Sequence, residues 1–200
     1  TLQALRASGR VDHLILVVPP GHEARCRTEL LEPFGLHADA VIPGGADRQA
    51  SVFAGLSRVP EGTDLVLVHD GARPFVTVGV IQAAVSAASE AGAAVVAVPV
   101  TDTIKVAGPD GSVKETPERG RLWAAQTPQV FRPALLREGH LRALQDGFRG
   151  TDDSALVERL GHPVRLVPGV PENLKITTPA DLALAEHVLR AGQFEPVRRP

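Results

Sequence analysis

The chain has 200 residues, of which 44% are hydrophobic and 22% are charged, as is ordinary for one folded domain of this length. Its net charge of −2 provides no excess of positive charge to attract nucleic acid non-specifically. Cys26 is the only cysteine, which excludes an internal disulfide and a cysteine-based zinc site and fits a reducing compartment. No apolar run approaches the length of a membrane span. These features predict a cytoplasmic protein that binds neither nucleic acid nor a membrane.

Strand and helix patterns alternate over the first half of the chain. The strands are near-continuous apolar runs, which are typical of strands buried on both faces. In chain order, the predicted elements are a helix at 1–7, a strand at 13–18, a helix at 22–34, a strand at 38–42, a helix at 47–56, a strand at 65–68, a helix at 78–91 and a strand at 93–98. This order predicts an α/β fold, with a Rossmann-like, mostly parallel sheet and helices on both faces.

The alternation stops after Val100, where the sequence predicts a hairpin. A Gly-Pro-Asp-Gly turn at 108–111 separates two short β patterns, at 103–106 and 113–115. We expect this hairpin to project from the sheet as a β-arm over 101–120. A hairpin this short is marginally stable alone and its apolar side chains need cover, so we predict a homodimer built on the arm.

The rest of the chain is predicted to complete the same domain. We expect polar turns at 123–129 and 150–153, helices at 133–144 and 152–160, a strand at 164–167 and an extended segment at 173–176. Thr178 and Pro179 are typical of the N-cap and the first residue of a last helix. Residues 193–200 show no periodicity and are predicted to fray. The prediction is therefore one domain over residues 1–200.

A glycine turn at 44–51 enters the predicted helix at 47–56. The free N–H groups and the dipole at such a helix start suit a ribose or phosphate oxygen. Arg48 is then a candidate phosphate ligand, and Ser51 faces back toward the turn. The pattern fits equally well a plain helix start in which Asp47 is the cap and Arg48 lies in solvent.

The motif His-Asp-Gly-Ala-Arg-Pro at 69–74 directly follows a predicted buried strand. In α/β sheets the loops at this end of the strands border the ligand crevice. Asp70 is a candidate ligand for a metal ion that bridges phosphates, and Arg73 is a candidate partner for an anion. A simple ion pair between Asp70 and Arg73 is the alternative, but the position at the crevice favours a function.

Three further polar residues are candidates with weaker patterns. Lys175 lies in a short extended segment before a helix, where it can neutralise a phosphate or simply extend its amine past apolar neighbours into water. Thr127 and Thr151 each stand next to a predicted helix start, where caps occur. Capping is the default for Thr151, while Thr127 is a candidate substrate contact that has no signal of its own. The seven histidines show no metal-ligand spacing, so the predicted catalysis is positioning and charge neutralisation.

Taken in order, these segments resemble the 2-C-methyl-D-erythritol 4-phosphate cytidylyltransferases of the non-mevalonate isoprenoid pathway. The matching stretches are GGADR (44–48) with SVFAGL (51–56), VLVHDGARP (66–74), PVTDTIK (99–105), LWAAQTPQ (122–129), TDDSA (151–155) and NLKIT (173–177). They follow the family's order over almost the whole chain. The resemblance implies a nucleotidyltransferase domain that joins CTP to a small polyol phosphate.

The resemblance also implies a role for each candidate residue. The cytidine half of CTP is implied to be held by Gly45, Ala46, Arg48 and Ser51. The implied catalytic residues are Lys175, Asp70 and Arg119, with Asp70 next to Mg²⁺-bound phosphates. The implied substrate contacts are Arg73, Thr103, Thr127 and Thr151. From the arm, Thr103 and Arg119 are implied to reach the site of a second subunit.

The reaction that the resemblance implies is an in-line attack by the substrate phosphate on the α-phosphorus of CTP, which releases pyrophosphate. No covalent enzyme intermediate is needed, because Mg²⁺ and basic side chains offset the charge of the two anions. Two alternatives stay open. A ribitol-5-phosphate cytidylyltransferase shares these motifs, and a module that binds CTP without turnover would retain most of them.

The resemblance has one departure, at the start of the chain. The family begins with a strand and a glycine-rich phosphate loop, and nothing of that kind precedes Thr1. Pro19 and Pro20 cannot replace such a loop, because proline lacks the N–H donor. We therefore expect about 30 to 40 residues before Thr1 in the native protein, and we expect the chain as given to turn over almost nothing.

Overall fold

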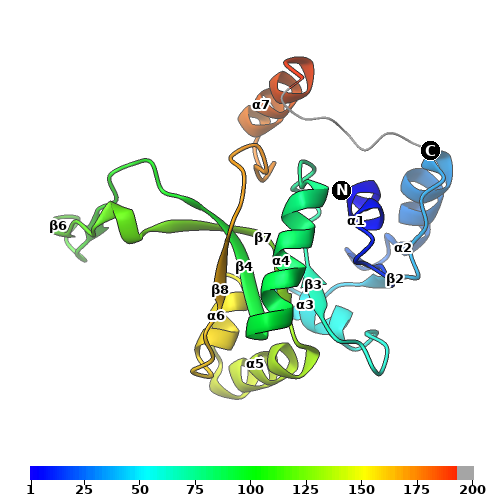
Figure 1. Ribbon diagram of the computed structural model, residues 1–200, viewed down its shortest axis with the longest axis horizontal. Coiled ribbons are helices and arrows are strands. Elements are labelled where there is room, and N and C mark those ends of the chain that lie inside the picture. Colours follow the sequence, from blue (N-terminus) through cyan, green and yellow to red (C-terminus); the bar gives the residue numbers. More distant parts are fainter. Residues whose placement is uncertain (193–200) are drawn as a thin grey trace.

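The computed structural model describes residues 1–192, and the predicted frayed tail at 193–200 lies outside the described residues. A four-stranded sheet forms the centre of the molecule (Figure 1). Across the sheet, the strands are β3 (Val66–Val68), β7 (Trp123–Phe131), β4 (Ala93–Pro99) and β8 (Arg165–Pro168). β7 is antiparallel to both of its neighbours, while β8 is parallel to β4. Three of the four strands therefore run in one direction, and β7 alone runs against them.

β7 is the element that the sequence prediction missed, since the polar turn expected at 123–129 is a strand. Gln126, Thr127 and Gln129 are polar but buried in it, and Pro128 within the run argued against a central strand. The register between β4 and β7 shifts around Val96, so β7 carries an irregularity where Pro128 has no N–H to donate to the ladder. The turn prediction was therefore wrong, because it relied on the polarity of this segment and did not consider pairing with distant strands.

Helices cover both faces of this sheet, as the alternation predicts. Side chains alternate between the faces along a strand, and the neighbours Val130 and Phe131 accordingly lie in two different apolar clusters. On one face, α4 (Val78–Ala91) packs against β4 and β8, with Ile81 and Ala84 fully buried. The other face is covered by α3 (Arg48–Leu56), α5 (Pro133–Asp146) and α6 (Asp153–Glu158). The predicted α/β fold is confirmed.

The first part of the chain forms a second, two-stranded parallel sheet beside the central one. It consists of β1 (Ile15–Val18) and β2 (Ala40–Pro43). The helical segments of this part are α1 (Leu2–Ala7), α2 (Glu23–Arg25), a π-helical turn (Cys26–Leu31) and a 3-10 turn (Glu32–Phe34). The N–H of Gly44 donates to the carbonyl of Val18 at 2.7 Å. The end of this small sheet thereby fixes where the glycine turn begins.

Two elements extend from the body of the molecule (Figure 1). One is the predicted arm, which contains β5 (Val106–Ala107) and β6 (Val113–Glu115) in an antiparallel pair. The other is α7 (Pro179–Arg190), whose Thr178 forms the predicted N-cap and a reciprocal capping box with Asp181. The hydrogen bonds from the Thr177 and Thr178 N–H groups lower the pKa of Asp181 to about 2. Within residues 1–192, no helix is both long and apolar enough to cross a membrane.

Candidate active site

A pocket of about 250 Å³ opens where β3 ends and β7 passes beside it. Its lining is mostly polar and is drawn from five separate parts of the chain. The lining residues are Arg48, Asp70, Arg73, Ala125, Gln126, Thr127, Gln129, Thr151, Asp152 and Lys175. Six of the residues that the sequence singled out therefore meet in one hollow at the predicted edge of the sheet.

The start of α3 places Arg48 at this pocket. The carboxylate of Asp47 caps the helix by accepting from the Ala50 N–H at 2.8 Å. The hydroxyl of Ser51 donates to the Asp47 carbonyl at 2.8 Å and accepts from the Gly45 N–H at 3.1 Å. These bonds fold the glycine turn onto the first turn of the helix. Gly45, Ala46 and Ser51 do not line the pocket itself, and their role in nucleotide binding stays a prediction.

Gly45 is expected to tolerate no side chain. A Cβ at this position would lie 2.4 Å from the Cβ of Ala50 and 3.0 Å from its carbonyl carbon. Gly45→Ala should therefore push the turn away from α3 and lower the free energy of unfolding by roughly 1–3 kcal/mol, measured by urea unfolding. Gly79→Ala is the matched control, because nothing lies within 4 Å of its Cβ and it should be neutral or stabilising.

The basic and acidic side chains of the pocket alternate along one chain of contacts. Lys175 Nζ lies 2.9 Å from Asp70 Oδ2, and Asp70 Oδ1 accepts from Arg48 Nε at 2.9 Å. Burial by itself would raise the pKa of Asp70, but the hydrogen bonds from Lys175 and Arg48 outweigh it and lower that pKa. Asp70 is therefore held ionised between two cations at the mouth of the site.

Arg48 contacts two carboxylates rather than one. Its Nη1 donates at 2.8 Å to Asp153, whose side chain is only 1% exposed. Burial by itself would lower the pKa of Arg48, but Asp153 and Asp70 together raise it. The sequence alternative of a solvated Arg48 is therefore wrong.

The loop that carries Asp70 is held by Thr127 and His69. The hydroxyl of Thr127 accepts from the Asp70 N–H at 3.0 Å and lies 3.1 Å from His69 Nδ1. His69 Nε2 lies 3.0 Å from the Arg73 carbonyl, which can only accept, so Nε2 carries the proton and Thr127 donates to Nδ1. Burial lowers the pKa of His69, which favours this neutral form. The Thr127 hydroxyl thus orients the loop, and its role as a substrate contact stays a prediction.

Arg73 enters the pocket from the far side of the same loop. Its Nη1 donates to the Asn173 carbonyl at 2.8 Å, which ties the loop to the segment that carries Lys175. Its buried Nε has no hydrogen-bond partner, and burial lowers the pKa of the guanidinium. An Asp70–Arg73 ion pair, the alternative from the sequence, does not form. The Arg73 guanidinium lines the pocket without a carboxylate partner.

Besides Gly45, Ala46 and Ser51, two predicted residues lie outside the pocket, and four lining residues were missed. Thr103 and Arg119 are exposed on the arm, and Arg119 Nη1 donates to the Thr101 carbonyl at 3.0 Å. Their roles stay predictions. The residues missed are Ala125, Gln126, Gln129 and Asp152. Gln126 and Gln129 gave no signal in the sequence, because they lie in the segment that was misread as a polar turn.

Asp152, rather than Thr151, is the N-cap of α6. It accepts from the Ala155 N–H at 2.9 Å, and its other oxygen accepts from Gln129 Nε2 at 2.8 Å. The capping role considered for Thr151 is therefore wrong. Thr151 is exposed at the rim of the pocket, and its role as a substrate contact stays a prediction.

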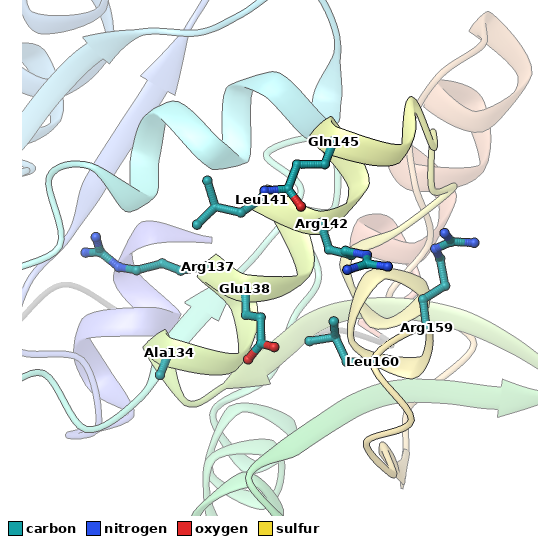
Figure 2. Close-up of a pocket in the computed structure, with 8 residues that line it drawn as sticks. All are labelled: Ala134, Arg137, Glu138, Leu141, Arg142, Gln145, Arg159 and Leu160. Carbon is teal, nitrogen blue, oxygen red and sulfur yellow. The ribbon is translucent and has the colours of Figure 1, made fainter.

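A larger groove of about 590 Å³ lies along α5 and is distinct from this site (Figure 2). Its residues are Ala134, Arg137, Glu138, Leu141, Arg142, Gln145, Arg159 and Leu160. The three arginines of this groove already have partners within the protein. Arg137 donates to the Leu56 carbonyl, and Arg142 and Arg159 both donate to the Asp146 carboxylate. The groove contains none of the predicted site residues, so the smaller pocket is the candidate active site.

The residues that could hold a divalent cation at this pocket are few. Among the described residues, no group of three or more histidine, cysteine, aspartate or glutamate side chains is placed to hold a metal ion. Mg²⁺ usually binds through one or two carboxylates together with substrate phosphates. The Asp70 carboxylate faces the pocket, but its oxygens are paired with Arg48 and Lys175, so it would hold a divalent cation only if the exposed Lys175 turned away. The oxygens of Asp152 are used by the start of α6 and by Gln129.

The fold and the pocket define the class of protein. An α/β sheet with a carboxylate between cations at its strand ends is arranged for chemistry on phosphates, as in a nucleotidyltransferase. Residues 1–191 match the sequence model of IspD, 2-C-methyl-D-erythritol 4-phosphate cytidylyltransferase. The chain belongs to this family, which confirms the resemblance seen in the sequence.

Individual relatives agree with the family match. The chain is 48% identical over 193 residues to the 2-C-methyl-D-erythritol 4-phosphate cytidylyltransferase of Pelotomaculum thermopropionicum, covering 96% of this chain and 81% of that protein. It is also similar to a solved 4-diphosphocytidyl-2C-methyl-D-erythritol synthase from Anaerococcus prevotii, with a TM-score of 0.88, 31% identity and coverage of 95% and 87%. The solved 2-C-methyl-D-erythritol 4-phosphate cytidylyltransferase of Thermus thermophilus is similar as well, with a TM-score of 0.79 and 40% identity. That match covers 94% of this chain and 87% of the other.

Proposed function

We propose that this protein transfers CMP from CTP to 2-C-methyl-D-erythritol 4-phosphate and releases pyrophosphate. Family membership supports the reaction, and the convergence of Lys175, Arg73 and Asp70 in one pocket is the observation that carries it. Two anions must approach each other in this reaction, and cations fixed in place offset their repulsion without reorganising. The reaction is placed in the cytoplasm, which suits the one free thiol, Cys26.

In the proposed mechanism the chain positions the reactants and forms no covalent bond with them. A phosphate oxygen of the acceptor attacks the α-phosphorus of CTP, and the bond from that phosphorus to the pyrophosphate oxygen breaks. Lys175 and the guanidinium of Arg73, which both line the pocket, supply positive charge for the phosphate oxygens. Mg²⁺, held by Asp70, would neutralise further phosphate charge when bound. Gly45, Ala46 and Ser51 form the turn proposed to hold the cytidine.

A pyrophosphate-release assay of the full-length protein tests this function. We expect turnover with CTP to exceed turnover with ATP or GTP, and 2-C-methyl-D-erythritol 4-phosphate to be the better acceptor. Faster release with ribitol 5-phosphate would overturn the acceptor and keep the reaction class. CTP binding by calorimetry with no release for either acceptor would instead identify a binding module without turnover.

We propose that the protein is a homodimer built on the arm, with Thr103 and Arg119 reaching the pocket of the second subunit. Ile104, Val106 and Val113 support this, since all three are exposed on the arm and Val113 is 62% exposed. Val113→Lys should therefore dissociate the dimer in analytical ultracentrifugation at micromolar concentration. The matched control is Leu144→Lys on α5, where a leucine is 70% exposed away from the arm. A monomeric wild-type protein would contradict the proposal.

A further inference from the structure

Behind the pocket lies a buried pair of polar side chains that the proposed chemistry does not use. His140 on α5 and Asp153 on α6 are 2% and 1% exposed, and His140 Nε2 lies 3.2 Å from Asp153 Oδ1. Burying a carboxylate and an imidazole away from water costs free energy unless each is paired. A pair kept in the core at this cost, next to an active site, needs an explanation.

The pair continues directly into the pocket through Arg48. Asp153 Oδ2 accepts from Arg48 Nη1 at 2.8 Å, and Arg48 Nε donates to Asp70 Oδ1 at 2.9 Å. The guanidinium is planar and its donors have a fixed geometry, so seating one edge on Asp153 determines where the other edge points. The position of Asp153 is thereby transmitted to the carboxylate of Asp70.

Asp153 and His140 are themselves held firmly. The Asp153 N–H donates to Gln129 Oε1 at 3.1 Å, directly after the Asp152 cap of α6. The His140 ring stacks on Phe53 of α3, with ring centroids 5.6 Å apart. The network therefore joins the three helices that cover this face of the sheet, and the Asp153 side chain reaches the ligand pocket through Arg48 and its contact with Asp70.

The charges around Arg48 show why it is suited to hold the Asp70 carboxylate. Asp153 and Asp70 together balance the charge of Arg48, which leaves little attraction for a phosphate. Arg73 contrasts with it, because its hydrogen bond goes to a neutral carbonyl and its Nε has no partner. Arg73 is thus suited to bind an anion, and Arg48 is suited to hold a carboxylate in place.

We propose that His140 and Asp153 are positioning residues that act through Arg48 to fix the Asp70 carboxylate in the pocket. Their effect is on the geometry of the reacting groups rather than on nucleotide affinity. The kinetic part of the test rests on the proposed function.

Steady-state kinetics of four variants of the full-length protein separate the possibilities. Asp153→Asn and His140→Leu should lower kcat on the order of ten- to a hundredfold, with KM for CTP within about twofold of wild type. His140→Gln, whose amide can still donate to Asp153, should restore kcat to within about threefold. Asp146→Asn is the matched control, since it removes a carboxylate with two basic partners, Arg142 and Arg159, outside the pocket, and should leave both parameters unchanged.

Two outcomes would overturn the proposal. A raised KM for CTP with unchanged kcat in Asp153→Asn would mean that Arg48 binds the nucleotide directly. Equal losses in His140→Leu and His140→Gln would mean that His140 only fills space.

A readout without turnover keeps the test separate from the proposed function. The heteronuclear NMR signal of the Arg48 Nε–H, assigned by its loss in Arg48→Lys, should shift in Asp153→Asn and His140→Leu and stay in place in His140→Gln. If wild-type protein releases no pyrophosphate, the proposed function fails while this signal still decides the inference. An Arg48 signal unchanged in all variants would overturn it.

Discussion

Lys175→Ala is expected to lower turnover on the order of a hundredfold, equivalent to about 3 kcal/mol of transition-state stabilisation. Lys175 is the most accessible cation of the pocket, with a side chain 40% exposed, and its ammonium lies 2.9 Å from Asp70. Its charge can therefore turn toward the phosphates of an incoming nucleotide while staying near the carboxylate. Initial rates of pyrophosphate release at saturating CTP measure the effect.

The control for this variant removes a charge far from the site. Arg58→Ala deletes an exposed cation in the turn between α3 and β3, and it should keep full activity. Since Arg48 still pairs with Asp70 when Lys175 is removed, the urea midpoint of Lys175→Ala should stay close to wild type. Near wild-type turnover in Lys175→Ala would show that the lysine only extends past Leu174 and Ile176 into water, the alternative that the sequence left open.

Asp70→Asn should lower turnover by on the order of a hundredfold or more. The substitution keeps the size of the side chain but removes the charge that Arg48 and Lys175 both contact. It also removes the one carboxylate that fits a divalent cation, so we expect the variant to lose most of its response to added Mg²⁺. Asp64→Asn, an exposed carboxylate ahead of β3, serves as the control. A variant that keeps its full rate would exclude Asp70 from catalysis.

The same variant makes a prediction about acid stability. The pKa of Asp70 is lowered in the folded protein from an ordinary value of 3.8. The ionised carboxylate therefore stabilises the fold fully above pH 3.8, and this contribution is lost as the pH falls through the folded-state pKa. Asp70→Asn has no such contribution to lose. Its free energy of unfolding should accordingly fall less steeply than that of wild type below about pH 4.

Much of the fold could be predicted where a single segment carries its own signal. The boundaries of α4 agree with the prediction because its apolar periodicity is uninterrupted and Gly92 ends it with a positive φ of 84°. Thr178, Pro179 and Asp181 likewise specify the start of α7 without help from the rest of the chain. β7 is the opposite case, since its place between β3 and β4 is decided by pairing partners distant in the sequence.

The candidate site divides in the same way. The glycine turn and the loop after β3 were recognisable because each is a short motif at the end of an apolar strand. The partners of these motifs were not, since Arg48 meets Asp153 across 105 residues of sequence and Arg73 meets Asn173 across 100. His140 had no signal at all, because a histidine on an amphipathic helix is more often a surface residue than a buried partner of a carboxylate.

The long sequence separations within the pocket have a kinetic meaning. Contacts between distant residues form only after the entropy of closing the intervening loops has been overcome, which slows folding and places such contacts late. The bond from the Asp70 N–H to Thr127 spans 57 residues, the bond from Arg73 to Asn173 spans 100 and the bond from Arg48 to Asp153 spans 105. A refolding chain would thus regain its helices well before its catalytic competence, and enzyme activity would report on completion of the whole sheet.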